Sequence, residues 1–274
     1  MIESDKEIQR LERQIKAFED ILEFCISNRM RNHDGPHINL ALIILGNDIK
    51  EIAKSVLCLF KNNLLVGIDS LNRIALEKLM YLKLVYNNEL KSKAFYLKIQ
   101  LKRIELINNL IFDEEFLKSY MKLSNSSLDQ VKKLISMDNV EFQDMKQKMF
   151  DAYKEIYEYD INDDWVFKHT WYNFDGKTKD LFTLAQKVQL KDDYRIYYEL
   201  FSQEVHSKSL GHQYKIVQKK DSTYLEILDV ITNTNKAYMI MYLGLYIDEV
   251  IVMFFERYRI PKKMSDTYYE AINL

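Results

Sequence analysis

The sequence predicts an all-α protein built as a multi-helix bundle. Apolar residues recur at helical spacing through most of the chain, and hydrophobic residues make up 47% of its 274 positions, enough for a sizeable core. Only six glycines and two prolines interrupt the pattern, and a chain this poor in turn-forming residues favours long helices with short connections. A fold dominated by β-strands is not expected.

The first two helices are predicted over residues 3–31 and 38–61. The opening stretch, "MIESDKEIQRLERQIKAFED", is charged and amphipathic, and it lacks the hydrophobic core of a signal peptide. Cys25 and Cys58 lie within the apolar patterns of these helices, and neither belongs to a CxxC or Cys/His cluster. We therefore expect two buried thiols in a reducing cytoplasm.

The same periodicity predicts the rest of the chain. Further helices are expected near residues 64–88, 91–111, 126–136, 139–158, 178–188, 193–210 and 235–258, with a short helix after Pro261. Turn-rich breaks occur at residues 32–37, 122–129 and 168–180. None is a long Gly/Ser/Pro linker, and no repeat has a solenoid period. The simplest organisation is a single helical domain over residues 1–274, with residues 113–160 as a candidate inserted helical subdomain.

The charges are nearly balanced. With 39 basic and 41 acidic residues, the formal net charge is −2, so no global field attracts nucleic acid or an anionic membrane. Two local runs stand out: "KSKAFYLKIQLKR" is basic with interleaved aromatics, and "DAYKEIYEYDINDDW" is mostly acidic. Both are typical of solvated helix faces.

The most apolar segment is Ala237 to Phe255. It contains Asp248 and Glu249, which a membrane span would place near its middle at great cost. We therefore interpret the segment as a buried central helix or a subunit interface. This interpretation predicts a homodimer and no membrane association.

Arg73 and Glu77 lie four residues apart in the helix predicted over 64–88, so they are neighbours on one face. That face also contains apolar residues such as Met80 and Leu84. Buried charges are costly unless they are paired. Two interpretations stay open: a structural Arg–Glu pair on a partly exposed helix, or a pair kept in the core because it orients or polarises a ligand.

The helix predicted over 193–210 carries a second polar edge. Its members recur at offsets of four, three and four residues: Arg195, Glu199, Ser202 and His206. A Ser–His pair on a regular helix lacks the strained turn and the oxyanion donors that serine hydrolases require. His206 is either a hydrogen-bonded core histidine or a general acid, a general base or a phosphate contact.

These two segments resemble an all-helical bacterial family, domain of unknown function 5677. The resemblance is carried by "GIDSLNRIALEKLMYLKLVY", with its Arg-x-x-x-Glu, and by "DDYRIYYELFSQEVHSKS", with its Tyr-x-x-x-Ser-x-x-x-His. It covers roughly residues 40 to 255, and a tryptophan segment lies between the two motifs. By motif position it implies the site residues Arg73, Glu77, Tyr198, Ser202 and His206, with Trp165 or Trp171. It implies no reaction, because the family has no established activity. We add Arg195 and Trp171 to Tyr198 as candidate binding residues.

A second resemblance is to HEPN-class helical proteins, many of them ribonucleases in bacterial defence or toxin systems. That class carries an arginine, four to six residues, and then a histidine, and "RNHDGPH", Arg31 to His37, fits with five intervening residues. The resemblance implies metal-independent chemistry, with the histidine as acid/base at the 2′-hydroxyl and the arginine stabilising the phosphorane, in two copies across a dimer. Gly35 and Pro36 predict an interhelical turn here, and a polar loop without function is the alternative.

No metal or cofactor is expected. His33, Asp34 and His37 could offer ligands, but the Gly-Pro turn gives them no fixed face and no further cluster completes a site. The sequence has no Walker loop and no GxGxxG to hold a nucleotide.

The leading functional hypothesis is a cytoplasmic, HEPN-like ribonuclease of a phage-defence or toxin-type system. Its catalytic residues would be Arg73, Glu77, Ser202 and His206. RNA and a partner protein of a defence operon are the expected partners. The alternative is a non-enzymatic interaction or sensor module, in which the same four residues form a structural polar network.

Overall fold

The computed structural model describes residues 3–28, 35–62, 64, 67–135, 139–157, 159–198, 214–219, 222–227 and 233–273. The predicted fold class is confirmed, because helices dominate the described residues. The chain divides into two compact units: unit 1 draws on residues 1–86 and 184–274, and unit 2 on residues 87–183. The single-domain organisation with an insertion at 113–160 stays a prediction.

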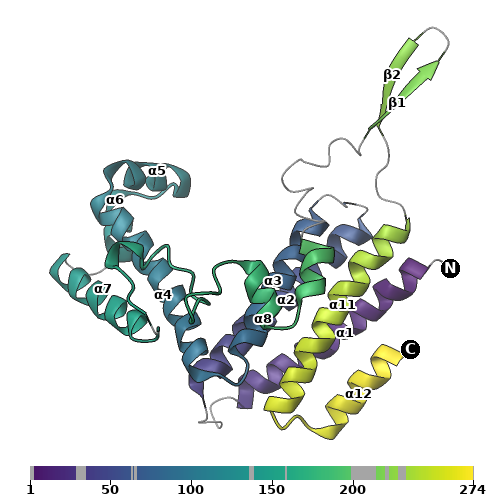
Figure 1. The fold of residues 1–274 in the computed structure, drawn as a ribbon, viewed down its shortest axis with the longest axis horizontal. Coiled ribbons are helices and arrows are strands. Elements are labelled where there is room, and N and C mark those ends of the chain that lie inside the picture. The colour runs from purple at the N-terminus through teal and green to yellow at the C-terminus, as the bar shows by residue number, and fades with distance from the viewer. Residues whose placement is uncertain are drawn as a thin grey trace. The chain divides into compact units, whose positions relative to one another are not determined.

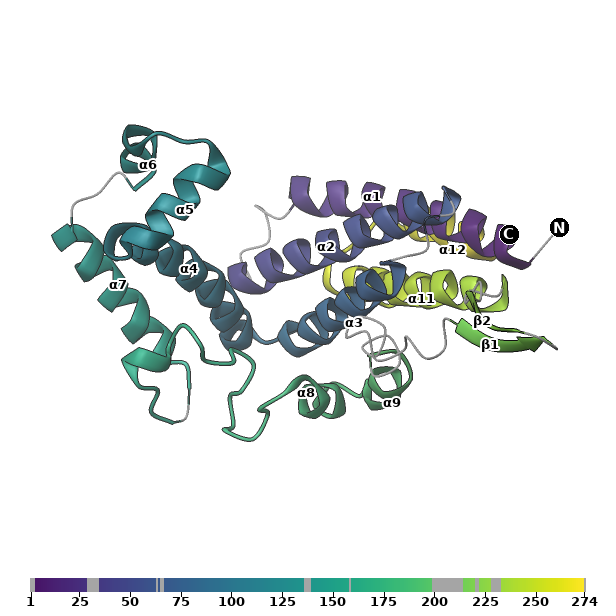
Figure 2. The ribbon, with the colours of Figure 1, turned by 90° about the horizontal axis from the view of Figure 1, so that it is seen from above.

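Unit 1 is a bundle of long helices. Its main elements are α1 (Glu3–Asn28), α2 (Pro36–Lys61), α3 (Ile68–Val85), α11 (Asn233–Arg257) and α12 (Lys262–Asn273). Helix α2 packs against α1, α3 and α11, and α12 lies along α1 (Figures 1 and 2). The bundle therefore joins the N-terminal part of the chain to its C-terminal part.

The centre of the bundle is closely packed. The rings of Phe18 on α1 and Phe254 on α11 meet edge to face, with their centroids 5.5 Å apart. Gly46 of α2 makes room for them, since a Cβ atom there would lie 3.1 Å from Phe254 and 3.2 Å from Phe18. The apolar stripe that predicted α2 is thus the stripe that fills the core.

Helix α2 begins earlier than the sequence pattern suggested. Gly35 takes the N-cap position with a φ of 67°, and Pro36 follows inside the first turn, where its fixed φ suits a helix and its missing N–H is not needed. His37 therefore lies in the first turn of a helix. The expectation of an interhelical turn at His37 is wrong.

Unit 2 is built on helices α4 (Glu89–Phe112), α5 (Glu114–Ser124), α6 (Leu128–Ile135) and α7 (Asn139–Lys154), with a short 3₁₀ turn, η2 (Asp163–Trp165). Helix α5 was not predicted. Asp113 separates α4 from α5 by a single extended residue, and its carboxylate caps α5 by accepting from the Phe116 N–H at 2.9 Å.

Three short helical segments lead back to unit 1. They are α8 (Leu181–Lys187), α9 (Lys191–Asp193) and η3 (Tyr194–Tyr198), and η3 is a π-helix. The helix predicted over 193–210 is described only as far as Tyr198, so its second half lies outside the described residues.

A β-hairpin, which the sequence analysis did not predict, follows in the chain. Strands β1 (Tyr214–Lys219) and β2 (Ser222–Ile227) pair antiparallel, from Tyr214 opposite Ile227 to Lys219 opposite Ser222. Both strands are short runs containing β-branched or aromatic residues, a composition that favours strands.

The two cysteines differ in environment. Cys25 of α1 is buried, and burial raises the pKa of its thiol to about 12. Cys58 of α2 is exposed, so the expectation of two buried thiols is wrong for this residue. Both cysteines lie within apolar helical patterns, but Cys58 lies at the edge of the apolar stripe of α2, where the helix meets solvent.

The segment Tyr238–Arg257 of α11 is long and apolar enough to cross a membrane by composition alone. Half of it is buried within the fold, as in the core helix of a bundle.

Candidate functional site

The best-defined polar contact among the predicted site residues joins Arg73 of α3 to Tyr198 of η3. Arg73 donates from Nη2 to the Tyr198 hydroxyl at 2.5 Å, and its guanidinium carbon lies 4.1 Å from the centre of the same ring. The tyrosine is 8% exposed and the arginine is half-buried. A hydrogen bond and a cation–π contact therefore hold the cation in a partly desolvated place.

The π-helical turn positions this tyrosine. Tyr194 and Tyr198 lie at the two ends of η3, and their rings stack with centroids 4.5 Å apart and an interplanar angle of 15°. π-helical turns are rare and occur frequently at functional sites. Arg73, Tyr198 and Tyr194 thus form a stack of one cation and two rings, which we call the α3–η3 site.

Glu77 does not pair with Arg73. Its carboxylate accepts from the hydroxyl of Tyr81, one turn further along α3, at 2.5 Å, while Arg73 bonds to Tyr198. Among the described residues, each charged group of the predicted pair therefore has a tyrosine hydroxyl as its partner.

The other predicted residues are placed as follows. Arg195 is exposed on η3, and His37 is half-buried in the first turn of α2. Trp171 is buried in unit 2, where its ring meets Phe95 edge to face at 5.2 Å. The remaining candidates lie outside the described part of the chain: Arg31, His33, Asp34, Glu199, Ser202 and His206.

No metal centre is visible in the part of the chain that the structure describes. Its residues contain no group of three or more His, Cys, Asp and Glu side chains able to hold an ion.

A second polar cluster in unit 1 surrounds Asp248 of α11. Its Oδ1 accepts from Gln14 Nε2 at 2.5 Å and from the Tyr268 hydroxyl. Its Oδ2 forms an ion pair with Arg10 at 3.3 Å, and Gln14 also donates to the Gly244 carbonyl at 3.3 Å. Burial, and then the bond to Asp248, raise the pKa of Tyr268. The cluster joins α1, α11 and α12. Asp248, whose charge made a membrane span unfavourable in the sequence, therefore has a structural role here.

Unit 2 has its own polar centre at His169. Its Nδ1 lies 3.0 Å from the Tyr153 hydroxyl, and its Nε2 lies 2.8 Å from the Tyr159 hydroxyl. Tyr159 donates its proton to the Asn173 carbonyl at 2.6 Å, so Nε2 must carry hydrogen and Nδ1 must accept from Tyr153. Burial, and then the charge of Lys98, lower the pKa of His169 to about 4. The imidazole is therefore neutral near pH 7.

Lys98 of α4 holds the loop that carries this histidine. Its Nζ donates to the carbonyls of Val166, Phe167 and His169 at 3.2, 2.8 and 2.8 Å. Burial lowers the pKa of Lys98 to about 8, while the three carbonyls favour its ammonium form. All three donors of the ammonium are therefore used to fix the backbone.

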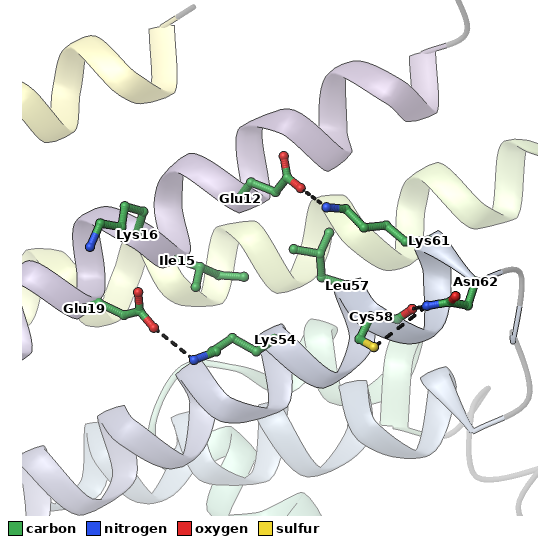
Figure 3. A pocket seen from close by; sticks show the side chains of 9 residues that line it. All are labelled: Glu12, Ile15, Lys16, Glu19, Lys54, Leu57, Cys58, Lys61 and Asn62. Atoms are coloured by element: carbon green, nitrogen blue, oxygen red, sulfur yellow. Dashed lines mark hydrogen bonds and ion pairs between the residues drawn. The ribbon is translucent and has the colours of Figure 1, made fainter.

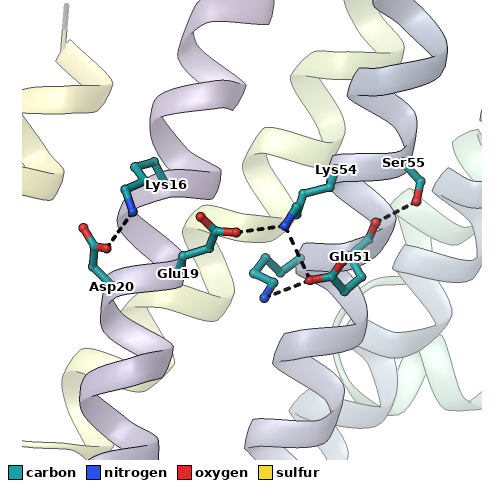
Figure 4. Close-up of polar contacts among 7 residues, drawn as sticks. Lys16, Glu19, Asp20, Glu51, Lys54 and Ser55 are labelled. Carbon is teal, nitrogen blue, oxygen red and sulfur yellow. Dashed lines mark hydrogen bonds and ion pairs between the residues drawn. The ribbon is translucent and has the colours of Figure 1, made fainter.

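A groove of about 540 Å³ runs between α1 and α2 (Figure 3). Its lining residues are Glu12, Ile15, Lys16, Glu19, Lys54, Leu57, Cys58, Lys61 and Asn62. Lys54 pairs with Glu19 at 3.0 Å, and Lys61 pairs with Glu12. Figure 4 shows that Lys16 bonds to Asp20 on its own helix, at 3.1 Å. All three lysines of the groove are thus bonded to carboxylates of the chain. Two of these ion pairs, those of Lys54 and Lys61, link α2 to α1, so the groove has a structural role.

Some polar residues of these centres were missed by the sequence analysis. Tyr81 was expected on the same face of the helix as Arg73 and Glu77, as part of its apolar stripe, but not as the hydrogen-bond partner of Glu77. The tyrosines around His169 carried a weaker signal, because "YKEIYEY" predicts only an acidic helix face. Nothing in the sequence indicates that Lys98 binds carbonyls about seventy residues away.

The fold and the α3–η3 site define an all-α bundle with an arginine–tyrosine contact at a π-helical turn. Residues 40–223 match the model of a family described as "Family of unknown function (DUF5677)". The match covers more than half of the chain, so the chain belongs to this family, as the Arg/Glu and Tyr/Ser/His segments predicted. No curated protein and no solved structure matches the chain.

Proposed function

We propose that this protein is a cytoplasmic, HEPN-like ribonuclease of a bacterial phage-defence or toxin-type system, acting without a metal ion. The observation that carries the proposal is the contact between Arg73 and Tyr198. It joins the Arg/Glu edge of α3 to the turn that directly precedes Ser202 and His206 in the sequence. The contact uses one of the five N–H donors of a guanidinium, and the others suit phosphate oxygens.

Each residue has a role in this proposal. His206 takes the proton of a ribose 2′-hydroxyl, and the 2′-oxygen attacks the neighbouring phosphorus. Arg73 stabilises the charge that develops on the phosphorane oxygens. The bond to the 5′-oxygen then breaks, and His206 gives this leaving oxygen the proton that it took from the 2′-hydroxyl. Glu77 and Ser202 orient the substrate, and the products are a 2′,3′-cyclic phosphate and a 5′-hydroxyl.

A second arginine–histidine pair belongs to the same proposal. Arg31 and His37 have the HEPN spacing, and His37 lies in the first turn of α2, which begins at Pro36. The HEPN resemblance implies this motif at the start of a helix. The start of α2 thus favours His37 as an alternative catalytic histidine.

An interaction or sensor module is the second candidate function. It is favoured by the partners of the two charged side chains: Arg73 bonds to Tyr198 and Glu77 bonds to Tyr81, so both are accommodated within the chain. In this case the α3–η3 site stabilises the bundle, and Arg73 and Glu77 do not need to contact RNA to be accounted for. The partner would be a protein of the same operon.

Cleavage of a varied RNA pool by purified protein distinguishes the two candidates. In a ribonuclease, His206→Ala abolishes cleavage with little change in melting temperature, and Arg73→Lys lowers the rate because lysine lacks the planar fork. Arg103→Lys is the matched control, since Arg103 is exposed on α4. Cleavage that persists in a chelator establishes independence from metal ions.

The Arg31→Ala and His37→Ala variants show which histidine acts. Loss of cleavage in these variants, with full cleavage by His206→Ala, assigns the reaction to the HEPN motif. In a structural network, His206→Ala instead lowers the melting temperature, because a buried unpaired partner costs roughly 1–3 kcal/mol. If the wild-type protein leaves the RNA intact and His206→Ala lowers the melting temperature, the enzyme hypothesis is wrong.

A further inference from the structure

The solvent side of α11 is apolar along most of its length. Tyr238, Leu245 and Val252 are 52%, 45% and 40% exposed, and intervals of seven residues keep them on one side of the helix. Partly exposed apolar neighbours widen this row: Met241, Tyr242 and Phe255. We call this surface the α11 face. It explains why α11 satisfies the composition of a membrane span although only half of that segment is buried.

Three carboxylates border the α11 face, and each is engaged by the chain itself. Asp248 belongs to the cluster with α1 and α12 described above. Glu249 forms an ion pair with Lys83, and Glu256 accepts from the Tyr86 hydroxyl at 2.8 Å. A basic partner would therefore find carboxylates that are already bonded, and an acidic partner would be repelled. The surface that fits best is another apolar helix face.

We propose that the α11 face is the contact surface of a homodimer in which two α11 helices pack antiparallel. The row is symmetric about Leu245, with Tyr238 seven residues before it and Val252 seven residues after it. A two-fold axis at Leu245 sets this residue against its own copy and sets Tyr238 against Val252 of the second copy. Such a self-complementary patch is what an isologous interface requires.

The carboxylates select the antiparallel orientation. A parallel pair in register would place Asp248, Glu249 and Glu256 each beside its own copy, and like charges that face each other are unfavourable. In the antiparallel pair Glu249 lies opposite Met241 and Asp248 lies opposite Tyr242, so neither carboxylate faces its own copy.

Sedimentation equilibrium of the full chain tests the interface. The wild type is expected to be a dimer, and Leu245→Arg a folded monomer, because its charge would be buried without a partner. That change should raise the dimer Kd by about a hundredfold or more. Ile26→Arg is the matched control: Ile26 of α1 is also 45% exposed, and this variant should remain dimeric. A monomeric wild type, or a dimer that tolerates Leu245→Arg, overturns the proposal. A wild type that stays monomeric but binds neutral phosphatidylcholine vesicles would assign the face to a lipid surface instead.

Disulfide cross-linking tests the orientation. In a Cys58→Ser background, which removes the exposed native thiol, Leu245→Cys should form a covalent dimer on oxidation. Tyr238→Cys alone should not, whereas a mixture of Tyr238→Cys and Val252→Cys chains should cross-link. Ile26→Cys serves as the control for random collisions. Efficient cross-linking of Tyr238→Cys alone would indicate a parallel pair and overturn the antiparallel arrangement.

Discussion

Arg73 and Tyr198 lie 125 residues apart in the sequence, yet the Arg73 guanidinium lies over the Tyr198 ring and donates to its hydroxyl at 2.5 Å. The tyrosine thus offers both its π-face and its oxygen to one cation. The contact holds the π-helical turn η3 to α3. It also gives this half-buried arginine a hydrogen-bond partner other than the neighbouring Glu77, which bonds to Tyr81.

Two substitutions of Tyr198 separate these contributions. Tyr198→Phe keeps the ring face and loses the hydroxyl, so the free energy of unfolding should fall by about 1 kcal/mol. Tyr198→Leu also loses the cation–π contact and should cost about 1 kcal/mol more. Urea denaturation followed by circular dichroism measures both, at one fixed protein concentration. Tyr269→Phe, at a 46% exposed position, is the control and should change stability by less than about 0.5 kcal/mol. A Tyr198→Leu variant as stable as the wild type would show that the contact does not stabilise the fold.

The pKa of His169 predicts an acid-sensitive unit 2. Its pKa in the folded state, about 4, lies below the ordinary 6.5, so the unfolded chain binds the proton more readily. The contribution of the neutral His169 ring to the free energy of unfolding is complete above pH 6.5. It is lost as the pH falls from 6.5 through 4, because the unfolded chain takes up the proton first. Both tryptophans of the chain, Trp165 and Trp171, belong to unit 2, so their fluorescence reports its unfolding.

The matching variants are His169→Gln and His37→Gln. The first removes the titrating ring and should flatten the dependence of unit 2 stability on pH, at some cost in stability at neutral pH. The second lies in unit 1, whose unfolding the tryptophans of unit 2 do not report, and should keep the slope of the wild type. An unchanged slope in His169→Gln would assign the acid sensitivity to other groups.

Lys98→Met should destabilise unit 2 by about 2–4 kcal/mol, because three backbone carbonyls lose their common donor. Methionine has a similar length and helix propensity, so the change isolates the ammonium. Lys102→Met on the same helix is exposed and should cost less than about 0.5 kcal/mol. Urea denaturation followed by tryptophan fluorescence compares the two. Equal midpoints for both variants would contradict a role of Lys98 in holding the loop.

The helices of unit 1 could be predicted because their signal is local. Apolar periodicity and the scarcity of Gly and Pro place α1, α2, α3 and α11 within a few residues of their observed bounds. Helix α5 was missed because Asp113 ends one helix and caps the next, with no glycine or proline to mark the break. The hairpin was missed because two strands of six residues are too short to stand out beside long helices.

The partners within the site could be predicted less well. Spacing on α3 indicated that Arg73 and Glu77 are neighbours, and the segment containing Tyr198 was identified from its motif. That Arg73 bonds to Tyr198 instead of Glu77 depends on how η3 packs against α3, which no local pattern encodes. The same reason applies to Lys98, whose ligands belong to a loop far along the chain.

Gly244 of α11 lies close to the Asp248 cluster, and its replacement by alanine should disturb that cluster. A Cβ atom at this position would lie 2.8 Å from Gln14 Oε1, which is too close. Gln14 would have to move, although its amide donates to Asp248 and to the Gly244 carbonyl. Gly244→Ala should therefore lower the free energy of unfolding by about 1–3 kcal/mol, despite the higher helix propensity of alanine.

A double-mutant cycle with Gln14→Ala tests this cause. In the Gln14→Ala background the close contact is absent, so Gly244→Ala should be neutral or stabilise the protein by about 0.5–1 kcal/mol. Gly46→Ala is the control: its Cβ would meet the rings of Phe254 and Phe18, and Gln14→Ala should not rescue it. Urea denaturation of all variants at one protein concentration gives the coupling energies, since the stability of the proposed dimer would depend on concentration. If Gly244→Ala costs the same free energy with and without Gln14, the contact between them is not what requires a glycine in α11.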